Sequence, residues 1–151
     1  MANGAPKREV YKVISIVDAS LGTSSANIVL HTAEESETLV RTIFDLTFNS
    51  GSAAGSEYGF IYQRAPNGNV IAGAGHDQNL DDYVQDFDIM RHNGMIGTVT
   101  TINAPKDRHL FRDLKSQRKL EKDDTLVLSH VAEVASNIKM YGIITMFFKV
   151  T

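Results

Sequence analysis

The sequence predicts an all-β fold in which short antiparallel strands pack as a sandwich or close into a barrel. About nine or ten runs rich in β-branched and aromatic residues follow one another, many alternating apolar with polar residues. Clusters of Gly, Asn, Asp and Ser separate these runs at a spacing typical of all-β domains. The main candidate for a helix is residues 76–90. We therefore expect at most short helical turns, placed in loops.

The first third of the chain predicts three strands. Residues 10–17 form a β-rich run, and residues 26–32 follow the turn-like "DASLGTSS". The run "TLVRTIFDLTF" alternates most clearly and is expected to bury one face. That face carries Val40, Thr42, Phe44, Leu46 and Phe48, and the opposite face carries Leu39, Arg41, Ile43, Asp45 and Thr47.

The middle of the chain predicts a hairpin. The run "EYGFIYQR" ends at "PNGN", residues 66–69, where Asn-Gly accepts a positive φ at little cost. The run "VIAGAG", residues 70–75, is then expected to be the return strand. Further strands are expected in "FDIMRH", "MIGTVTTI", "HLFRDLKSQRKL", "TLVLSHVA" and "IKMYGIITMFFKV".

Length and composition predict one soluble domain over residues 1–151. The chain has 151 residues, 42% of them hydrophobic, which is enough for one buried core. Residues 1–9 are expected to be a short flexible N-terminal segment. The absence of Cys excludes disulfides, thiolate metal sites and Cys nucleophiles. The longest apolar run, residues 142–148, is too short to span a bilayer, so we expect no membrane association.

The acidic loop after residue 76 is a weak match to a calcium loop. Its Asp77, Asn79 and Asp81 occupy the first, third and fifth positions, and Asp88 the twelfth. Asp82, however, replaces the Gly that the sharp turn requires. A capped, solvated acidic loop is the simpler interpretation, and a calcium ion shared between subunits remains the alternative. No pattern of metal-binding His residues or nucleophile elbow is found, so we expect no catalytic residues, cofactor or resident metal.

Basic residues concentrate in one segment, although the whole chain has a net charge of -3. Six of the fifteen Lys and Arg residues lie between positions 108 and 122. If residues 111–120 form one strand, alternation places Arg112 and Arg118 on one face and Lys115 and Lys119 on the other. These four residues are candidate contacts to nucleic acid or to another subunit. The alternative is that they are solvated charges that discourage edge pairing.

The C-terminal third resembles a known family. The segment "LKSQRKLEKDDTLVLSHV", residues 114–131, reads as a charged strand, a polar turn at residues 121–124 and an apolar strand. With the following "G-x-x-T-x-F-F-K", it resembles the last strands of single-jelly-roll capsid proteins of small circular Rep-encoding single-stranded DNA (CRESS-DNA) viruses. "HTAEESETLVRTIFDLTF" and "DFDIMRHNGMI" are similar to earlier strands of that fold, so the resemblance covers most of residues 26–151.

The resemblance implies an eight-stranded antiparallel jelly-roll sandwich whose subunits form an icosahedral capsid around the genome. It implies a non-enzymatic structural protein of the virion that assembles inside the host cell, with copies of itself and single-stranded DNA as partners. Subunit contacts are expected in loops, at residues 49–57, 73–86 and 103–107. The chain departs from the family in its N-terminal arm, which carries only Lys7, Arg8 and Lys12 rather than an Arg-rich stretch.

Two other functions remain open. A non-viral jelly-roll module, monomeric or trimeric, could bind carbohydrate or a receptor through exposed aromatics, and the candidates are Tyr58, Phe60, Tyr62 and Tyr83. A cupin-type enzyme would need clustered ligands. Its candidate ligands, which are scattered along the chain, are His31, His76, His92, His109, His130 and Glu133.

Overall fold

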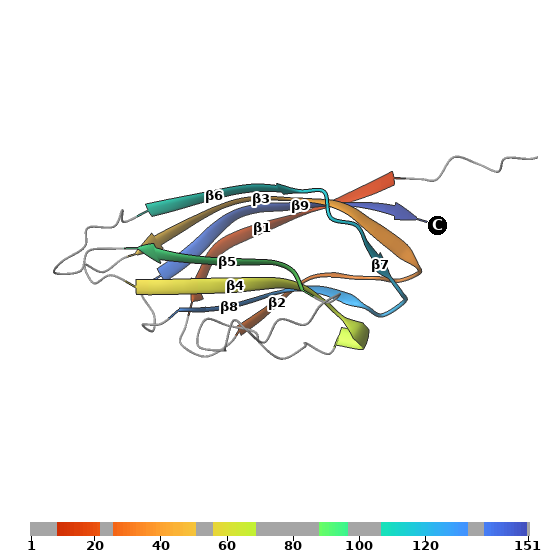
Figure 1. The fold of residues 1–151 in the computed structure, drawn as a ribbon, viewed down its shortest axis with the longest axis horizontal. Helices are drawn as coiled ribbons and strands as arrows, with labels where there is room; N and C mark the ends of the chain where they lie inside the picture. The colour runs from red at the N-terminus through yellow and green to blue at the C-terminus, as the bar shows by residue number, and fades with distance from the viewer. Residues whose placement is uncertain are drawn as a thin grey trace, which may run out of the picture.

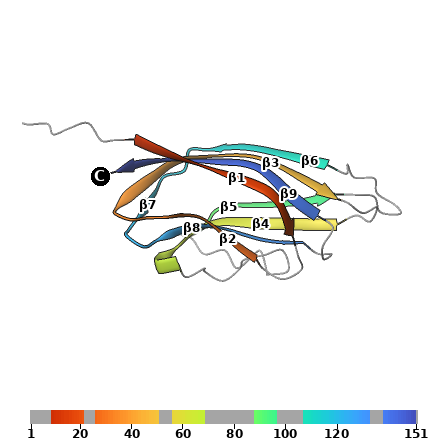
Figure 2. The ribbon, with the colours of Figure 1, turned by 180° about the vertical axis from the view of Figure 1, so that it is seen from behind.

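The structure is a computed structural model that describes residues 9–21, 26–50, 56–68, 88–96, 107–132 and 138–150. These residues form nine strands and one short 3-10 helix, and the strands make two antiparallel sheets that pack face to face (Figure 1). Figure 2 shows the same two layers from behind. The prediction of an all-β sandwich is confirmed.

The first sheet, sheet A, has the strand order β1-β9-β3-β6, and β7 also pairs with β3. Its strands are β1 (Glu9–Leu21), β9 (Ile138–Val150), β3 (Glu37–Ser50), β6 (Asp107–Leu114) and β7 (Arg118–Leu120). The second sheet, sheet B, has the order β2-β8-β4-β5. Its strands are β2 (Ala26–Thr32), β8 (Thr125–Ala132), β4 (Ser56–Ala65) and β5 (Asp88–Ile96).

This strand order is that of a jelly roll. The first four strands each pair with a strand from the second half of the chain, taken in reverse order: β1 with β9, β2 with β8, β3 with β6 and β7, and β4 with β5. The chain is thus a long hairpin rolled across two sheets. Because β6 and β7 both pair with β3 and are separated only by residues 115–117, they are two parts of one strand. The eight-stranded jelly roll predicted from the sequence is confirmed.

The core lies between the sheets and is rich in aromatic side chains. Phe44 of β3 meets Tyr62 of β4 edge to face, with ring centroids 5.1 Å apart. The Tyr62 hydroxyl and the Thr42 hydroxyl hydrogen-bond at 3.0 Å, so the polar atoms that these two residues bury satisfy each other. Burial raises the pKa of Tyr62 well above its ordinary value. This pair joins the two sheets through the centre of the sandwich.

Strand β3 departs from the predicted alternation at its start. Leu39 is fully buried, although the sequence pattern placed it on the face opposite Phe44. The pairing with β9 shifts register between Leu39 and Arg41, so Val40 is an extra residue in a β-bulge. From Thr42 to Phe48 the alternation is as predicted.

The turn at Pro66–Gly68 is present, as a 3-10 turn in which Asn67 has a φ of 52°. The expected hairpin with residues 70–75 is not formed by β4, because β4 pairs with β5 on one side and β8 on the other. Residues 70–75 themselves lie outside the described part of the chain, as do most of the helix candidate and the proposed calcium loop. Residues 88–90, the end of that helix candidate, belong to strand β5.

A glycine in the last strand allows β9 and β3 to approach closely. Gly142 has a φ of 144°, and a Cβ atom there would overlap the carbonyl oxygen of Asp45 and lie 2.9 Å from the Cα of Leu46. Any larger residue would both strain the backbone and separate the strands. This requirement explains the Gly of the "G-x-x-T-x-F-F-K" pattern.

The polar turn predicted at residues 121–124 is also present, and it carries the chain from sheet A to sheet B. Asp123 has a φ of 74°, and the Asp124 amide donates to the Glu121 carbonyl at 3.1 Å. Ser36 donates to the Glu121 carboxylate at 2.9 Å, and this bond, with Lys119 nearby, holds the pKa of Glu121 below its ordinary value.

The buried carboxylate of Asp124 ties together the segments at this end of the sandwich. Its oxygens accept hydrogen bonds from the amides of Glu121 at 3.0 Å and Asn67 at 3.2 Å, and one lies 3.5 Å from Arg64. Its main chain bonds to Ala33, in the connection that follows β2. One side chain therefore stabilises the turn, the end of β4 and the 3-10 turn.

We predict that Asp124→Ala destabilises the folded chain by about 3 kcal/mol, because it leaves buried amide donors without an acceptor and removes the carboxylate beside Arg64. Asp123→Asn, a matched change at the exposed neighbour, should cost within about 0.5 kcal/mol, since Asn tolerates a positive φ. Urea unfolding followed by far-ultraviolet circular dichroism measures both. Equal stability of the two variants would contradict this role.

Candidate subunit interface

Each edge strand of the two sheets points a titratable side chain into the sandwich. These residues are Lys12 on β1, His31 on β2, His92 on β5, and Arg108 and Arg112 on β6. Their register partners include the core residues Met146, Leu126, Phe60, Phe48 and Phe44. Inward-pointing charges at sheet edges discourage the addition of another strand. We therefore expect the edges to resist strand-to-strand association.

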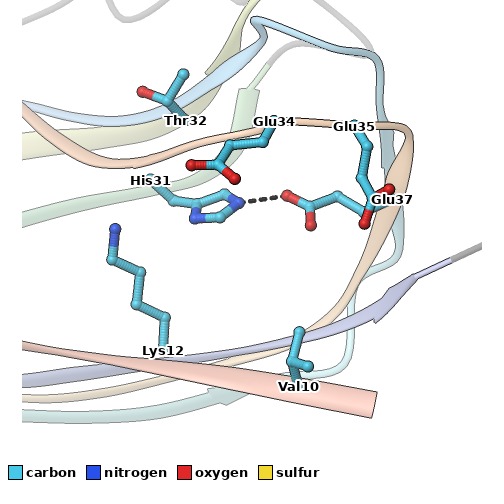
Figure 3. A pocket seen from close by; sticks show the side chains of 7 residues that line it. All are labelled: Val10, Lys12, His31, Thr32, Glu34, Glu35 and Glu37. Atoms are coloured by element: carbon cyan, nitrogen blue, oxygen red, sulfur yellow. Dashed lines mark hydrogen bonds and ion pairs between the residues drawn. The ribbon is translucent and has the colours of Figure 1, made fainter. Parts of the chain in front are cut away.

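The open side between β1 and β2 contains a cavity of about 260 Å³ (Figure 3). It is lined by Val10, Lys12, His31, Thr32, Glu34, Glu35 and Glu37. The His31 Nε2 atom bonds the carboxylate of the buried Glu37, and the His31 ring packs over Phe148 with centroids 4.2 Å apart. Among the described residues, no three His, Asp or Glu side chains are arranged to hold a metal ion. His31 and Glu37 therefore form a local pair that holds the connection between β2 and β3 against β9.

The open side between β5 and β6 is closed by His92. Its ring lies between Phe60 and Phe48, at centroid distances of 5.3 and 5.9 Å. Burial lowers the pKa of His92, and the positive charges of Arg108 and Arg112 lower it further. Burial at this edge of the core therefore favours the neutral form of the His92 imidazole.

The four predicted basic contact residues do not share one face. Arg112 and Arg118 pair with the buried residues Phe44 and Leu39, so they lie on the inner side of sheet A, at its edge. Arg118 is half-buried and donates to the Ser116 hydroxyl and the Gln117 carbonyl, both at 2.9 Å.

The two lysines differ from the arginines in exposure and position. Lys115 is exposed between β6 and β7. Lys119 faces outward and lies 3.3 Å from Glu121. The alternation predicted for residues 111–120 is thus present, interrupted at residues 115–117.

The outer face of sheet A is the most apolar surface in the described part of the chain. Six large apolar side chains with described surroundings are exposed, and five of them lie on this face. They are Tyr11 at 69%, Val13 at 50%, Phe111 at 60%, Tyr141 at 42% and Ile143 at 45% exposure. The outward positions of an antiparallel sheet are ordinarily polar. This face is therefore more apolar than the solvated face of an antiparallel sheet ordinarily is.

One row of side chains crosses this face from β1 to β6. The Tyr11 and Phe147 rings are 6.0 Å apart, and the Arg41 guanidinium lies 5.4 Å above the Phe147 ring. Arg41 also makes two hydrogen bonds to Asp113, at 2.8 and 2.7 Å. This bidentate pair raises the pKa of Arg41 and lowers the pKa of Asp113.

A second pair on this face joins His109 of β6 to Asp45 of β3. The carboxylates of Asp45 and Asp113 are thus both paired within the chain, and the positive charge of Arg41 is balanced by Asp113. The centre of the face therefore presents aromatic and aliphatic groups beside paired carboxylates.

The outer face of sheet B is different. Ile61 and Gln63 of β4 and Val127 and Ser129 of β8 point away from the core, yet each is at most 1% exposed. Val29, on the edge strand β2, is the sixth exposed apolar side chain and stands apart from the other five. These four residues at the centre of the face are therefore buried.

The aromatic residues suggested for ligand binding are not exposed where the structure describes them. Phe60 is 2% exposed and Tyr62 is fully buried in the core. Tyr83 and the side chain of Tyr58 lie outside the described part. The sequence reasoning missed Tyr11, Phe111 and Tyr141. The available signal was the run "YGIITMFF", which lacks the alternation of a strand with one solvated face.

Within the described segments, no helix has the length and apolar character needed to cross a lipid bilayer.

We predict that His92→Phe makes the protein relatively more stable as the pH falls from about 7.5 to about 5. The folded state lowers the pKa of His92, so it favours the neutral form of this side chain. At a pH above the ordinary pKa of 6.5, His92 is mostly neutral in both the folded and the unfolded state, and its burial carries no cost of deprotonation. Stability is lost as the pH falls toward the folded pKa. Phe keeps a ring between Phe48 and Phe60 without titrating. Thermal unfolding across this pH range tests the prediction, and parallel curves for the two proteins would contradict it.

Comparisons with known proteins give the chain no family. No protein-family model matches it, and no curated protein sequence is significantly similar to it. Among solved structures, this chain is similar to a chain in the structure of infectious bursal disease virus, Gx strain. The TM-score is 0.37 and the sequence identity is 11%, and the match covers 95% of this chain and 33% of the viral chain. The Gt strain matches with a TM-score of 0.26 and 10% identity, over 95% and 31% of the two chains.

A third solved structure, the T=1 particles derived from the same virus, matches with a TM-score of 0.26 and 11% identity, over 95% and 40% of the two chains. The chain thus spans between about a third and two fifths of the length of these structures. The jelly-roll assignment rests on the strand order of this chain itself.

Proposed function

We propose that this chain is a structural coat protein whose copies assemble into a closed shell. The observation that carries the proposal is the apolar outer face of sheet A. Its five exposed apolar side chains expose on the order of 500 Å², as much as the largest apolar patch of a typical soluble monomer. A rigid sandwich with such a face is suited to packing against other subunits. We further propose that the chain acts without catalysis.

Assembly into a shell would bury this apolar face in every copy of the chain. Identical subunits associate through contacts that close by symmetry, and individually weak contacts become strong when many form together. We propose an icosahedral shell that forms inside a host cell, becomes the virion and encloses a single-stranded DNA genome. Support for the viral assignment is the resemblance of residues 114–131 and 142–149 to the last strands of CRESS-DNA capsid proteins. The jelly-roll fold alone hosts several functions.

The basic residues Arg112, Lys115, Arg118 and Lys119 are proposed as contacts to the genome or to neighbouring subunits. The exposed Arg112 and Lys115 have the simpler access, because Arg118 is engaged in its own loop and Lys119 is close to Glu121. Phosphate contacts by these side chains would make retention of nucleic acid strongly dependent on salt, because each neutralised phosphate releases counterions.

We predict that purified protein forms uniform particles much larger than a trimer. Size-exclusion chromatography with light scattering measures the mass, and negative-stain microscopy shows the shape. The ratio of absorbance at 260 and 280 nm reports enclosed nucleic acid, and high salt after disassembly should release it. A stable monomer or trimer across varied salt and pH would contradict the coat function and favour a binding module.

A further inference from the structure

We propose that the outer face of sheet A packs against the same face of a second copy of this chain, around a two-fold axis. The inference rests on the self-association proposed above and names the surface and the partner. It adds a sheet face to the loops in which the sequence analysis expected subunit contacts.

The edges of the sheets are poor alternatives to the face. An added strand would have to lie beside β1, β2, β5 or β6, and each of these strands points Lys, His or Arg into the sandwich. Such charges oppose the continuation of a sheet into a neighbouring molecule. Association through a face meets no comparable obstacle.

The apolar side chains identify a second copy as the partner. In the described part of the chain, the only exposed large apolar side chain outside this face is the isolated Val29. Among the described residues of another copy, the one extended apolar surface that can match the face is therefore the face itself. A surface that matches itself makes a two-fold contact, in which each residue meets the same set of residues on its partner.

The paired charges at the centre of the face are compatible with burial against a second copy. Arg41 is paired with Asp113, and Asp45 with His109, so burial of the face would not leave these charges without partners. Lys139, Lys149 and Lys119 also project from the outer side of sheet A, near the ends of β9 and on β7. The paired side chains at the centre of the face permit close approach of an identical surface.

The size of the face is sufficient for a specific contact. A standard interface buries about 800 Å² on each partner. The five apolar side chains already contribute on the order of 500 Å². The polar and half-buried residues between them, such as Thr145 and Phe147, supply further area.

The absence of native Cys allows a direct test with single-cysteine variants. The variants Ile143→Cys on β9 and Ile43→Cys on β3 each place a single thiol near the centre of the face. Close to a two-fold axis, a residue lies near the same residue of the second chain. Val29→Cys places an equally accessible thiol on sheet B as the matched control. Each purified variant, in its assembled form, is treated with a mild oxidant or a short bifunctional maleimide. Non-reducing gel electrophoresis then measures the mass.

We expect the two face variants to shift from 16.6 kDa to about twice that mass, and the Val29→Cys control to stay at the single-chain mass. Because a two-fold contact uses both thiols, the product should stop at the dimer. Particles that form without a crosslink at either face position would overturn the two-fold contact while leaving the coat function intact. Crosslinking of Val29→Cys as efficient as that of the face variants would also overturn it.

The reverse result separates the two proposals. Crosslinked dimers at the face positions without larger particles would support the two-fold contact and overturn the shell. Circular dichroism of each variant establishes that it is folded, and both positions chosen on the face are at least partly exposed, so a Cys there leaves the core unchanged.

Discussion

The structure depends on the position of the last strand, β9, between β1 and β3. Without β9, strand β1 would be disconnected from the rest of sheet A, because β1 pairs with β9 and with no other described strand. The pairing of β9 with β3 extends from Glu37 to Ser50 and needs Gly142 where the two backbones approach most closely. Residues at the end of the sequence therefore complete a sheet that residues near the start began.

The same strand explains why the outer face of sheet A is apolar. Its inward side chains, among them Ile144 and Phe148, fill the core, while Tyr141 and Ile143 point outward and are largely exposed. A sandwich gives each strand only one buried face, so a strand with two apolar faces leaves one of them uncovered. Because the central outward residues of sheet B are already buried, the proposed assembly depends on the outer face of sheet A.

The end of the sandwich near residues 121–124 is held together by hydrogen bonds between segments that lie far apart in the sequence. Asp124 holds the turn, Arg64 and Asn67 together, and Asp123 and Asp124 bond the main chain of Ala33. The stretch "RKLEKDDTLVLSHV" therefore acts mainly as a structural corner between the sheets. Its basic residues are divided between the two sides of sheet A instead of forming one site.

Local patterns in the sequence were sufficient for features that depend on neighbours in the chain. The alternation from Thr42 to Phe48, the turn at residues 121–124 and the two-sided pattern of residues 111–120 are examples. The bulge at Val40 was not predictable, because it arises from the register with β9, about a hundred residues later. The hairpin expected after "PNGN" was wrong for the same reason, since β4 finds its partners in β5 and β8.

Site residues were harder to predict than strands. The pairing of Arg41 with Asp113, and of His109 with Asp45, joins segments far apart in sequence, so spacing gives no sign of it. The uninterrupted apolar run of β9 was the one local indication of an interface, and it reads equally well as core until the strand is placed in a sheet.

Sedimentation velocity of the double variant Tyr141→Ser and Ile143→Ser tests most directly whether the outer face of sheet A drives assembly. The variant removes two exposed apolar groups of β9 and leaves the core side chains unchanged, with Val29→Ser as the control on sheet B. We expect the double variant to sediment as a folded single chain while the control assembles like the wild type. A double variant that assembles as well as the control would contradict the account.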